Sequence, residues 1–298
     1  MQIVSDRAMD MSLEQMAGLD IHLAALTLTL DGRTYESGVD IQPDEFYRLL
    51  GASEGFPATS QPSPGEFAAL YRRLAESDPD ILSIHISSGL SGTLAAAQLG
   101  ASLVPEARVT FFDSKTLSGA LGWQVEVAAR AVKAGWGKDE VLELLREVRA
   151  ATETVFTVAT LRYLVHGGRI SHLKGLLASV LNIKPLIGVD KVSGKYVQRG
   201  QARTLKQAIL ALADQARVRY APGSALRLQV LHGNNPEGAA LLRQRLCEMY
   251  DCTWLPNGPI APVLGAHTGP GLVGLVFAPQ AAFTAVPAAL YVPDEATG

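Results

Sequence analysis

A short, mostly apolar run that opens directly into a glycine-spaced hydroxyl loop constrains the fold of this chain most strongly. The run covers residues 81–86, the loop is Ser87-Ser88-Gly89-Leu90-Ser91-Gly92-Thr93, and the alanine-rich stretch 94–103 follows. Apolar runs of this length are typical of buried strands, and the alanine-rich stretch is typical of a helix. The sequence therefore predicts a strand, a loop and a helix in succession.

The loop has the composition of an anion site. Backbone N–H groups at a helix N-terminus lack partners within the helix, the helix dipole favours negative charge there, and glycines let a ligand approach closely. The hydroxyls of Ser88, Ser91 and Thr93 add neutral donors. An ordinary capped helix has the same residues, because Ser and Thr are favoured N-caps. This stretch alone leaves both interpretations open.

Strands and helices alternate through the first half of the chain. Strands are expected at 3–6 and 108–114, and helices at 117–134 and from 138 onward. That order predicts an α/β domain over residues 1–155, with a mostly parallel sheet flanked by helices. Ligands bind such sheets at the carboxyl ends of the strands, where the loop at 87–93 would lie.

The second half has a less regular order of predicted strands and helices and is expected to form an α+β domain over residues 156–298. Strands are predicted at 156–161, 225–231 and 272–277, and amphipathic helices at 205–216 and 236–249. A ligand site is expected between the two domains.

Three further segments carry candidate functional residues. The hydroxyl cluster Thr59-Ser60-Gln61-Pro62-Ser63 precedes a predicted helix, and by itself it is typical of a cap and turn. His267 lies in a predicted glycine-rich loop at 265–271, and histidine can gain or share a proton near neutral pH. Arg169 follows two glycines, and Arg203 opens a predicted helix. Taken alone, these cations are typical of solvated surface charges.

Composition excludes several classes of protein. The net charge is −3, with 26 Lys and Arg against 29 Asp and Glu, and we expect no nucleic-acid partner because no long basic tract stands out. No run reaches the roughly 20 apolar residues of a membrane span. The first residues lack the regions of a secretory signal, which predicts a cytoplasmic protein. Cys247 and Cys252 fit neither a disulfide framework nor a zinc site.

The sequence does not indicate catalysis by this chain alone. It contains no HExxH, no Walker lysine motif and no GxGxxG, and the 89–93 segment lacks the last glycine of a hydrolase nucleophile elbow. We therefore predict neither a catalytic residue, nor a metal, nor a cofactor.

Six segments together resemble the DegV family of bacterial fatty-acid-binding proteins. Their order and spacing cover nearly the whole chain, although family members usually continue the first strand with Asp-Ser-Thr, whereas Ser5-Asp6 is followed here by Arg7-Ala8-Met9. That departure leaves the contribution of the first loop open. The segments are Thr59 to Ser63, Ser87 to Thr93, Leu161 to Ser171, Leu181-Asn182-Ile183-Lys184-Pro185, Arg203-Thr204 and His267 to Gly271.

The resemblance implies a two-domain protein that buries a long-chain fatty acid between its domains. It further implies a carrier rather than an enzyme: a separate ATP-binding kinase subunit would convert the bound carboxylate to an acyl phosphate for phospholipid synthesis, and transient membrane-surface contact would allow lipid exchange. Arg169 and Arg203 would serve the partner or the phosphate at the mouth of the site. The implied carboxylate-binding residues are Thr59, Ser60, Ser91, Gly92, His267 and Thr268.

Physical chemistry sets two requirements for such a ligand. Burial of an alkyl tail gains about 0.8 kcal/mol per methylene, or on the order of 10 kcal/mol for roughly fifteen carbons before ordering costs. The carboxylate beside it must be hydrogen-bonded, or it opposes binding. We expect residues 173–186 and part of the 94–103 helix to line the tail cavity, although plain core packing would give the same pattern.

Two rival interpretations remain open at this level. The Ser/Gly loop could hold phosphate in a phosphosugar-binding enzyme or sensor, or the chain could be a regulatory protein that binds no small molecule. A sugar pocket requires many polar side chains, so the apolar character of 173–187 favours the lipid.

Overall fold

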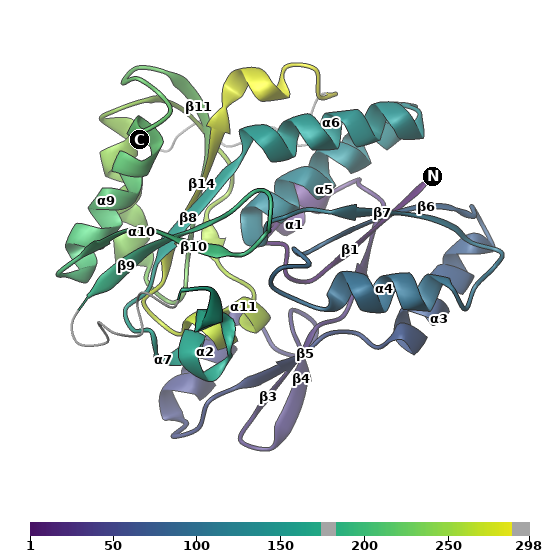
Figure 1. The fold of residues 1–298 in the computed structure, drawn as a ribbon, viewed down its shortest axis with the longest axis horizontal. Coiled ribbons are helices and arrows are strands. Elements are labelled where there is room, and N and C mark those ends of the chain that lie inside the picture. Colours follow the sequence, from purple (N-terminus) through teal and green to yellow (C-terminus); the bar gives the residue numbers. More distant parts are fainter. Residues whose placement is uncertain (174–182, 288–298) are drawn as a thin grey trace.

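The computed structural model describes residues 1–173 and 183–287 and builds them around three β-sheets (Figure 1). A parallel sheet and a larger mixed sheet stand side by side, and a small antiparallel sheet lies below them in the view of Figure 1. The predicted α/β fold is confirmed: the first sheet is parallel, and the second half of the chain forms a separate mixed sheet with its own helices.

The first sheet has four strands in the order β2-β1-β6-β7, and every neighbouring pair is parallel. Helices α3 and α4 cover one face and α5 and α6 the other (Figure 1). The elements are β1 (Gln2–Asp6), α1 (Leu13–Met16), β2 (Ile21–Ala24), α3 (Pro64–Ala75), β6 (Asp80–His85), α4 (Thr93–Ala101), β7 (Arg108–Asp113), α5 (Ser118–Lys133) and α6 (Lys138–Ala151).

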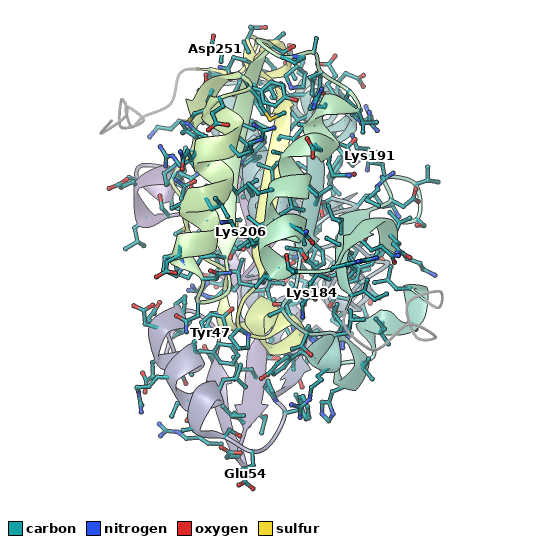
Figure 2. The ribbon with its side chains drawn as sticks, turned by 90° about the vertical axis from the view of Figure 1, so that its left-hand side faces the viewer. Tyr47, Glu54, Lys184, Lys191, Lys206 and Asp251 are labelled. Atoms are coloured by element: carbon teal, nitrogen blue, oxygen red, sulfur yellow. The ribbon has the colours of Figure 1, made fainter. Side chains whose placement is uncertain are left out.

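The second sheet runs β10-β9-β8-β14-β11-β12, with β13 also paired to β11. Only the β11–β12 and β11–β13 pairs are parallel. Helices α9 and α10 cover its outer face (Figure 2). The elements are β8 (Glu153–Thr157), α7 (Arg162–His166), the 3₁₀ turn η1 (Arg169–His172), β9 (Lys184–Val189), β10 (Tyr196–Ala202), α9 (Leu205–Arg217), β11 (Ala225–His232), α10 (Pro236–Cys247), β12 (Asp251–Trp254), β13 (Gly258–Pro259), β14 (Val273–Pro279) and the 3₁₀ turn η2 (Gln280–Phe283).

Helix α5 packs between the two large sheets and is buried on almost every face. Its Trp123 ring donates through Nε1 to Oε1 of Gln229 at 2.8 Å, and the carboxylate of Glu126 binds both Arg130 and Arg227. Because Gln229 and Arg227 belong to β11, these contacts join the two halves of the molecule. The predicted domain boundary at residues 155 and 156 falls within β8.

The third sheet is a small antiparallel addition to the two large sheets. Its order is β4-β3-β5, formed by β3 (Thr27–Leu30), β4 (Arg33–Glu36) and β5 (Ala58–Ser60). Helices α2 (Pro43–Ala52) and α11 (Pro262–Thr268) pack against it through a small core that includes Leu28, Phe46 and Ala266.

One local expectation was wrong. Residues 22–30 belong to two strands in different sheets, β2 and β3, and residues 51–64 contain β5. The segment around His267 was expected to be a glycine-rich loop, but its first part is the last turn of α11. Pro262 begins that helix, and Gly269, with a φ of 68°, follows its last residue.

Candidate functional site

A cavity of about 320 Å³ lies where the three sheets meet. The carboxyl end of β6, strand β5, helix α11, the turn η1 and the start of β10 all contribute to its wall. Its size is at the lower end of the range for small-molecule sites, about 300–1,000 Å³. The lining residues are Ala8, Leu26, Thr59, Ser60, Gln61, Ile86, Leu90, Ser91, Leu117, Arg169, Tyr196, Val263, Leu264, His267 and Thr268.

Most of the predicted site residues come together here. Thr59, Ser60, Ser91, Arg169, His267 and Thr268 line the cavity. Gly92 adjoins it, because a Cβ at this position would lie 2.6 Å from Oε1 of the lining residue Gln61. Arg203 is exposed, directly precedes the cap of α9, and does not line the cavity.

The centre of the polar wall is a contact between Thr59 and His267. Oγ1 of Thr59 and Nε2 of His267 are 2.8 Å apart, whereas Nδ1 of His267 is buried with no partner among the described residues. Burial lowers the pKa of His267 to about 3, and the nearby positive charge of Arg169 adds to this shift. The imidazole is therefore neutral near pH 7. A Cβ at Gly167 would lie 2.2 Å from its Nδ1, so a glycine is needed there.

Two hydroxyls near the start of α4 form a second polar group. Oγ of Ser91 is 2.8 Å from Oγ1 of Thr93 and accepts a hydrogen bond from the Thr93 backbone N–H at 3.3 Å. The two hydroxyls therefore lie at the N-terminus of α4, on either side of its N-cap residue Gly92. Thr268 differs, because its hydroxyl donates to the backbone oxygen of Leu264 at 3.1 Å.

Arg169 supplies positive charge to the cavity. Its side chain is half-buried, and Nη1 donates to the backbone oxygen of Gly167 at 2.7 Å, which holds the guanidinium beside His267. Burial lowers the pKa of Arg169, but an arginine remains a cation at any physiological pH.

The expected donor Ser88 does not face the cavity. Its hydroxyl and its backbone N–H both donate to the carboxylate of Asp113. The neighbouring residues hold the β9–β10 hairpin instead: Oγ of Ser87 donates to the backbone oxygen of Gly194 at 2.8 Å, and a Cβ at Gly89 would lie 2.6 Å from the backbone oxygen of Ser193. The first part of the loop therefore binds the other half of the protein, and Leu90 and Ser91 of its second part line the cavity.

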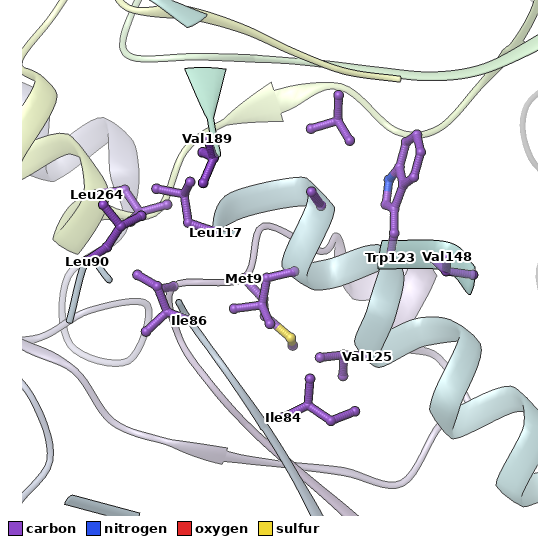
Figure 3. Packing of buried hydrophobic residues seen from close by; sticks show 14 of the residues in the cluster. Met9, Ile84, Ile86, Leu90, Leu117, Trp123, Val125, Val148, Val189 and Leu264 are labelled. Atoms are coloured by element: carbon purple, nitrogen blue, oxygen red, sulfur yellow. The ribbon is translucent and has the colours of Figure 1, made fainter. Parts of the chain in front are cut away.

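The other lining residues of the cavity are mostly apolar, and we call them its apolar wall. Ile86, Leu90, Leu117 and Leu264 gather at this wall, with Val189 of β9 close by (Figure 3). A small inner cavity of about 40 Å³ follows, and it shares four residues with the first. Those four are Leu117, Tyr196, Leu264 and Thr268, and the inner cavity is otherwise lined by Ser118, Thr154, Phe156, Leu231, Ile260, Leu272, Gly274, Leu275 and Val276.

The expected tail-lining segments need correction. Ala96 and Ala97 of α4 pack against Phe67 and Tyr71 of α3, and no residue of α4 lines either cavity. The alanine-rich helix is therefore ordinary core. Leu173 is buried in the main hydrophobic cluster, while residues 174–182 lie outside the described part of the chain.

Sequence reasoning missed Tyr196 and most of the apolar wall. Tyr196 is buried, it lines both cavities, and its ring contacts Phe156. Burial raises the pKa of its hydroxyl, which stays protonated as a donor. Its place at the start of a strand after Ser193-Gly194 predicts a hairpin, but no local signal shows which residues the ring meets.

The first loop contributes through a buried network rather than through hydroxyls. The carboxylate of Asp6 accepts hydrogen bonds from the backbone N–H groups of Ala8 at 3.0 Å and Ile86 at 2.9 Å, and it contacts Nδ1 of His85 at 2.9 Å. Nε2 of His85 is 2.7 Å from the hydroxyl of Ser83. Because Ala8 and Ile86 line the cavity, Asp6 positions two parts of its apolar wall.

A family model describes this architecture. The model of the DegV family, a family of uncharacterised proteins, matches residues 1–280. The chain belongs to the DegV family. A DegV domain-containing protein of Deinococcus radiodurans is 36% identical over 262 residues, which is 88% of this chain and 90% of that protein.

Solved DegV structures share the fold. The structure of a DegV family protein from Thermus thermophilus, described as fatty acid binding, is 30% identical with a TM-score of 0.84 and covers 93% of this chain and 99% of its own. The fatty acid kinase B3 protein of Streptococcus pneumoniae, loaded with linoleic acid, is 22% identical with a TM-score of 0.78 and covers 94% and 99%. At that lower identity the likeness concerns the fold.

Two features are absent from the described residues of this DegV protein. No three His, Cys, Asp or Glu side chains are grouped so that they could hold a metal ion. Within the same ranges, no helix has the length and apolar character needed to cross a bilayer.

Proposed function

We propose that this DegV protein binds a long-chain fatty acid, with its carboxylate at the polar wall and its tail directed into the inner cavity. The observation that carries the proposal is that polar and apolar residues line one cavity, which adjoins a second, mainly apolar cavity that shares four of its residues. The fatty-acid-binding relative from Thermus thermophilus supports it.

Hydroxyl groups would hold the carboxylate, and one neighbouring cation would offset its negative charge. When neutral His267 donates through Nε2 to Thr59, the Thr59 hydroxyl proton is free to donate to the ligand. The Ser91 hydroxyl offers a second donor, and Arg169 offsets the negative charge. Hydrogen bonds to a charged group contribute about 1.5–3 kcal/mol each, so loss of one is measurable. Ser60, Gly92 and Thr268 would shape the same wall.

We further propose that the protein is a carrier and not an enzyme by itself. A separate ATP-binding kinase subunit would transfer the terminal phosphoryl group of ATP to a carboxylate oxygen of the bound lipid, which gives an acyl phosphate and ADP. The described residues around the cavity offer hydroxyls, an imidazole and one guanidinium, which can hold a carboxylate but resemble no nucleotide motif.

Charge distribution supports a partner at this side of the molecule. Residues 161–220 contain eleven lysines and arginines against only Asp190 and Asp214, in a chain with a net charge of −3. This imbalance does not stand out in the sequence, because the lysines and arginines are spread out and form no long basic tract. Lys184, Lys191 and Lys206 mark it on the face shown in Figure 2. Arg169 and Arg203 belong to the same region and would meet the phosphate or the acidic surface of the partner.

The cellular setting follows from the same proposal. A cytoplasmic carrier fits the cysteines, since Cys247 and Cys252 are not bonded to each other. Lipid exchange would require transient contact with a membrane surface, for which the basic region provides an attraction to anionic headgroups.

A competition experiment tests the ligand class. The delipidated protein would be titrated with a fluorescent long-chain fatty acid, and unlabelled oleate and glucose 6-phosphate would then be added as competitors. Oleate should displace the probe, and the sugar phosphate should not, because the apolar wall leaves sugar hydroxyls unpaired. Displacement by the sugar phosphate alone would favour the phosphosugar function and overturn the lipid proposal.

A further inference from the structure

A larger cavity of about 470 Å³ lies beyond the inner cavity, and nothing in the proposed function uses it. Three methionines, Met9, Met11 and Met16, line it together with Leu13 and Leu23, and four prolines form part of its wall. We call this cavity the outer chamber. Leu13 is 83% exposed, so the chamber opens to solvent. Its other lining residues are Arg7, Asp10, Ser12, Ser37, Gly38, Gln42, Pro43, Gln229, Leu231, Pro256, Asn257, Gly258, Pro259, Ala261 and Pro262.

A thin partition separates the outer chamber from the inner cavity. Leu231 of β11 lines both spaces, so its side chain lies between them. Beside it, the hydroxyl of Ser118, which lines the inner cavity, donates to the carboxyl group of Asp10, which lines the outer chamber. The other oxygen of Asp10 accepts from the backbone N–H of Ala261 at 2.7 Å. Leu231, Ser118 and Asp10 therefore form the partition.

The available volume points to a use for the outer chamber. A water-sized group needs about 10–15 Å³ on this measure, so the 40 Å³ of the inner cavity hold about three such groups. An acyl chain that extends through the inner cavity would meet Leu231, the only described residue that the inner cavity shares with a larger space beyond it.

Resting on the proposed function, we propose that the Leu231 partition sets the acyl-chain limit and that the outer chamber receives the methyl end of longer chains. Long chains would displace the Leu231 side chain and contact the methionines behind it. Methionine suits this role because its unbranched thioether adapts to ligands of different length.

The backbone at the partition is strained, as sites under functional constraint often are. Ser118 has a φ of 58°, a left-handed conformation that a residue with a Cβ seldom adopts. Two contacts hold it there: its backbone N–H donates to the oxygen of Ala8 at 2.8 Å, and its hydroxyl donates to Asp10. Ala8 lines the first cavity, where the carboxylate is proposed to bind. The Ser118–Ala8 contact therefore connects the partition to that site.

A chain-length series tests the inference. The affinity of the wild type would be measured for saturated fatty acids that differ by two methylenes. Affinity should rise about fourfold per methylene until the tail reaches Leu231, and should then level off. Leu231→Ala should move this limit to longer chains, and Leu231→Phe to shorter ones. Adding Met16→Gln to Leu231→Ala should remove the gain for the longest chains only.

Leu228→Ala is the matched control. Leu228 lies on the same strand and is equally buried, but it packs in the cluster beneath α9 and α10, away from both cavities. Leu228→Ala should lose about as much stability as Leu231→Ala and leave the chain-length limit unchanged. An identical limit in Leu231→Ala, Leu231→Phe and Leu228→Ala, with tight binding retained, would overturn the partition but not the lipid site. A folded wild type that binds no fatty acid of any length would overturn both.

Discussion

The hydroxyl oxygen of Thr59 lies 2.8 Å from Nε2 of His267, although the two residues are 208 positions apart in the sequence. One comes from the small third sheet and the other from the last turn of α11, so the polar wall exists only when both elements are in place. The neutral imidazole can orient the threonine hydroxyl toward a ligand without competing for its proton.

Removal of the Thr59 hydroxyl should weaken lipid binding directly. Thr59→Val keeps the shape of the side chain and removes the donor, and we expect affinity for a long-chain fatty acid to fall about tenfold to a hundredfold. Titration calorimetry would measure the change. Thr29→Val is the control, because Thr29 has an exposed hydroxyl 2.8 Å from Thr34 in the same sheet. Equal affinities for the two variants would contradict the assignment.

Gly167 should be as important as a direct ligand contact. A Cβ at this position would lie 2.2 Å from Nδ1 of His267, so Gly167→Ala must displace the imidazole and with it the Thr59 contact. We expect a loss of lipid affinity similar to that of His267→Ala, measured by probe displacement. Gly51→Ala, where a Cβ would meet nothing within 4 Å, should bind normally. Unchanged binding by Gly167→Ala would show that the imidazole position is unimportant.

Asp10 should make stability depend on pH. Burial raises its pKa from 3.8 to about 6 despite hydrogen bonds from Ser118 and Ala261. Because the folded-state pKa is the higher one, this contribution to stability is complete below pH 3.8 and is lost as pH rises through about 6. The loss amounts to about 3 kcal/mol. Urea unfolding should show Asp10→Asn gaining that much relative to wild type between pH 4 and 7.5, and a difference that is constant with pH would contradict the prediction.

Variants of Arg169 and Arg203 should distinguish binding of the ligand from contact with the kinase partner. Arg169→Met should weaken binding of a fatty acid but not of the matching fatty alcohol, since only the acid carries the charge that the guanidinium offsets. Arg203→Met should leave both affinities unchanged, because Arg203 is exposed and does not line the cavity. With an ATP-binding kinase subunit and ATP, both variants should form acyl phosphate more slowly. Normal turnover by Arg203→Met would remove it from the proposed partner surface.

Local sequence signals predicted the elements that local physics determines. The apolar run before Ser87, the cap at Ser63 and the amphipathic periodicity of α9 each specify a strand or a helix from a few neighbouring residues. The motifs that resemble the DegV family also identified most residues of the polar wall, because those residues occur within short, ordered segments.

Long-range pairing explains what could not be predicted. Asp6 meets His85 only because β1 lies next to β6, and no pattern near either residue shows that contact. Ser88 looks like a ligand donor until Asp113 occupies its hydroxyl. Leu231 has the sequence pattern of any buried strand residue, although it lines two cavities.

Mass spectrometry of an organic extract from the full chain, purified without added lipid, tests the proposed function most directly. We expect about one long-chain fatty acid per protein molecule, and its absence from the extract of the Thr59→Val, His267→Ala double variant. An empty wild-type extract, together with no uptake when fatty acids are supplied to the folded protein, would contradict lipid binding.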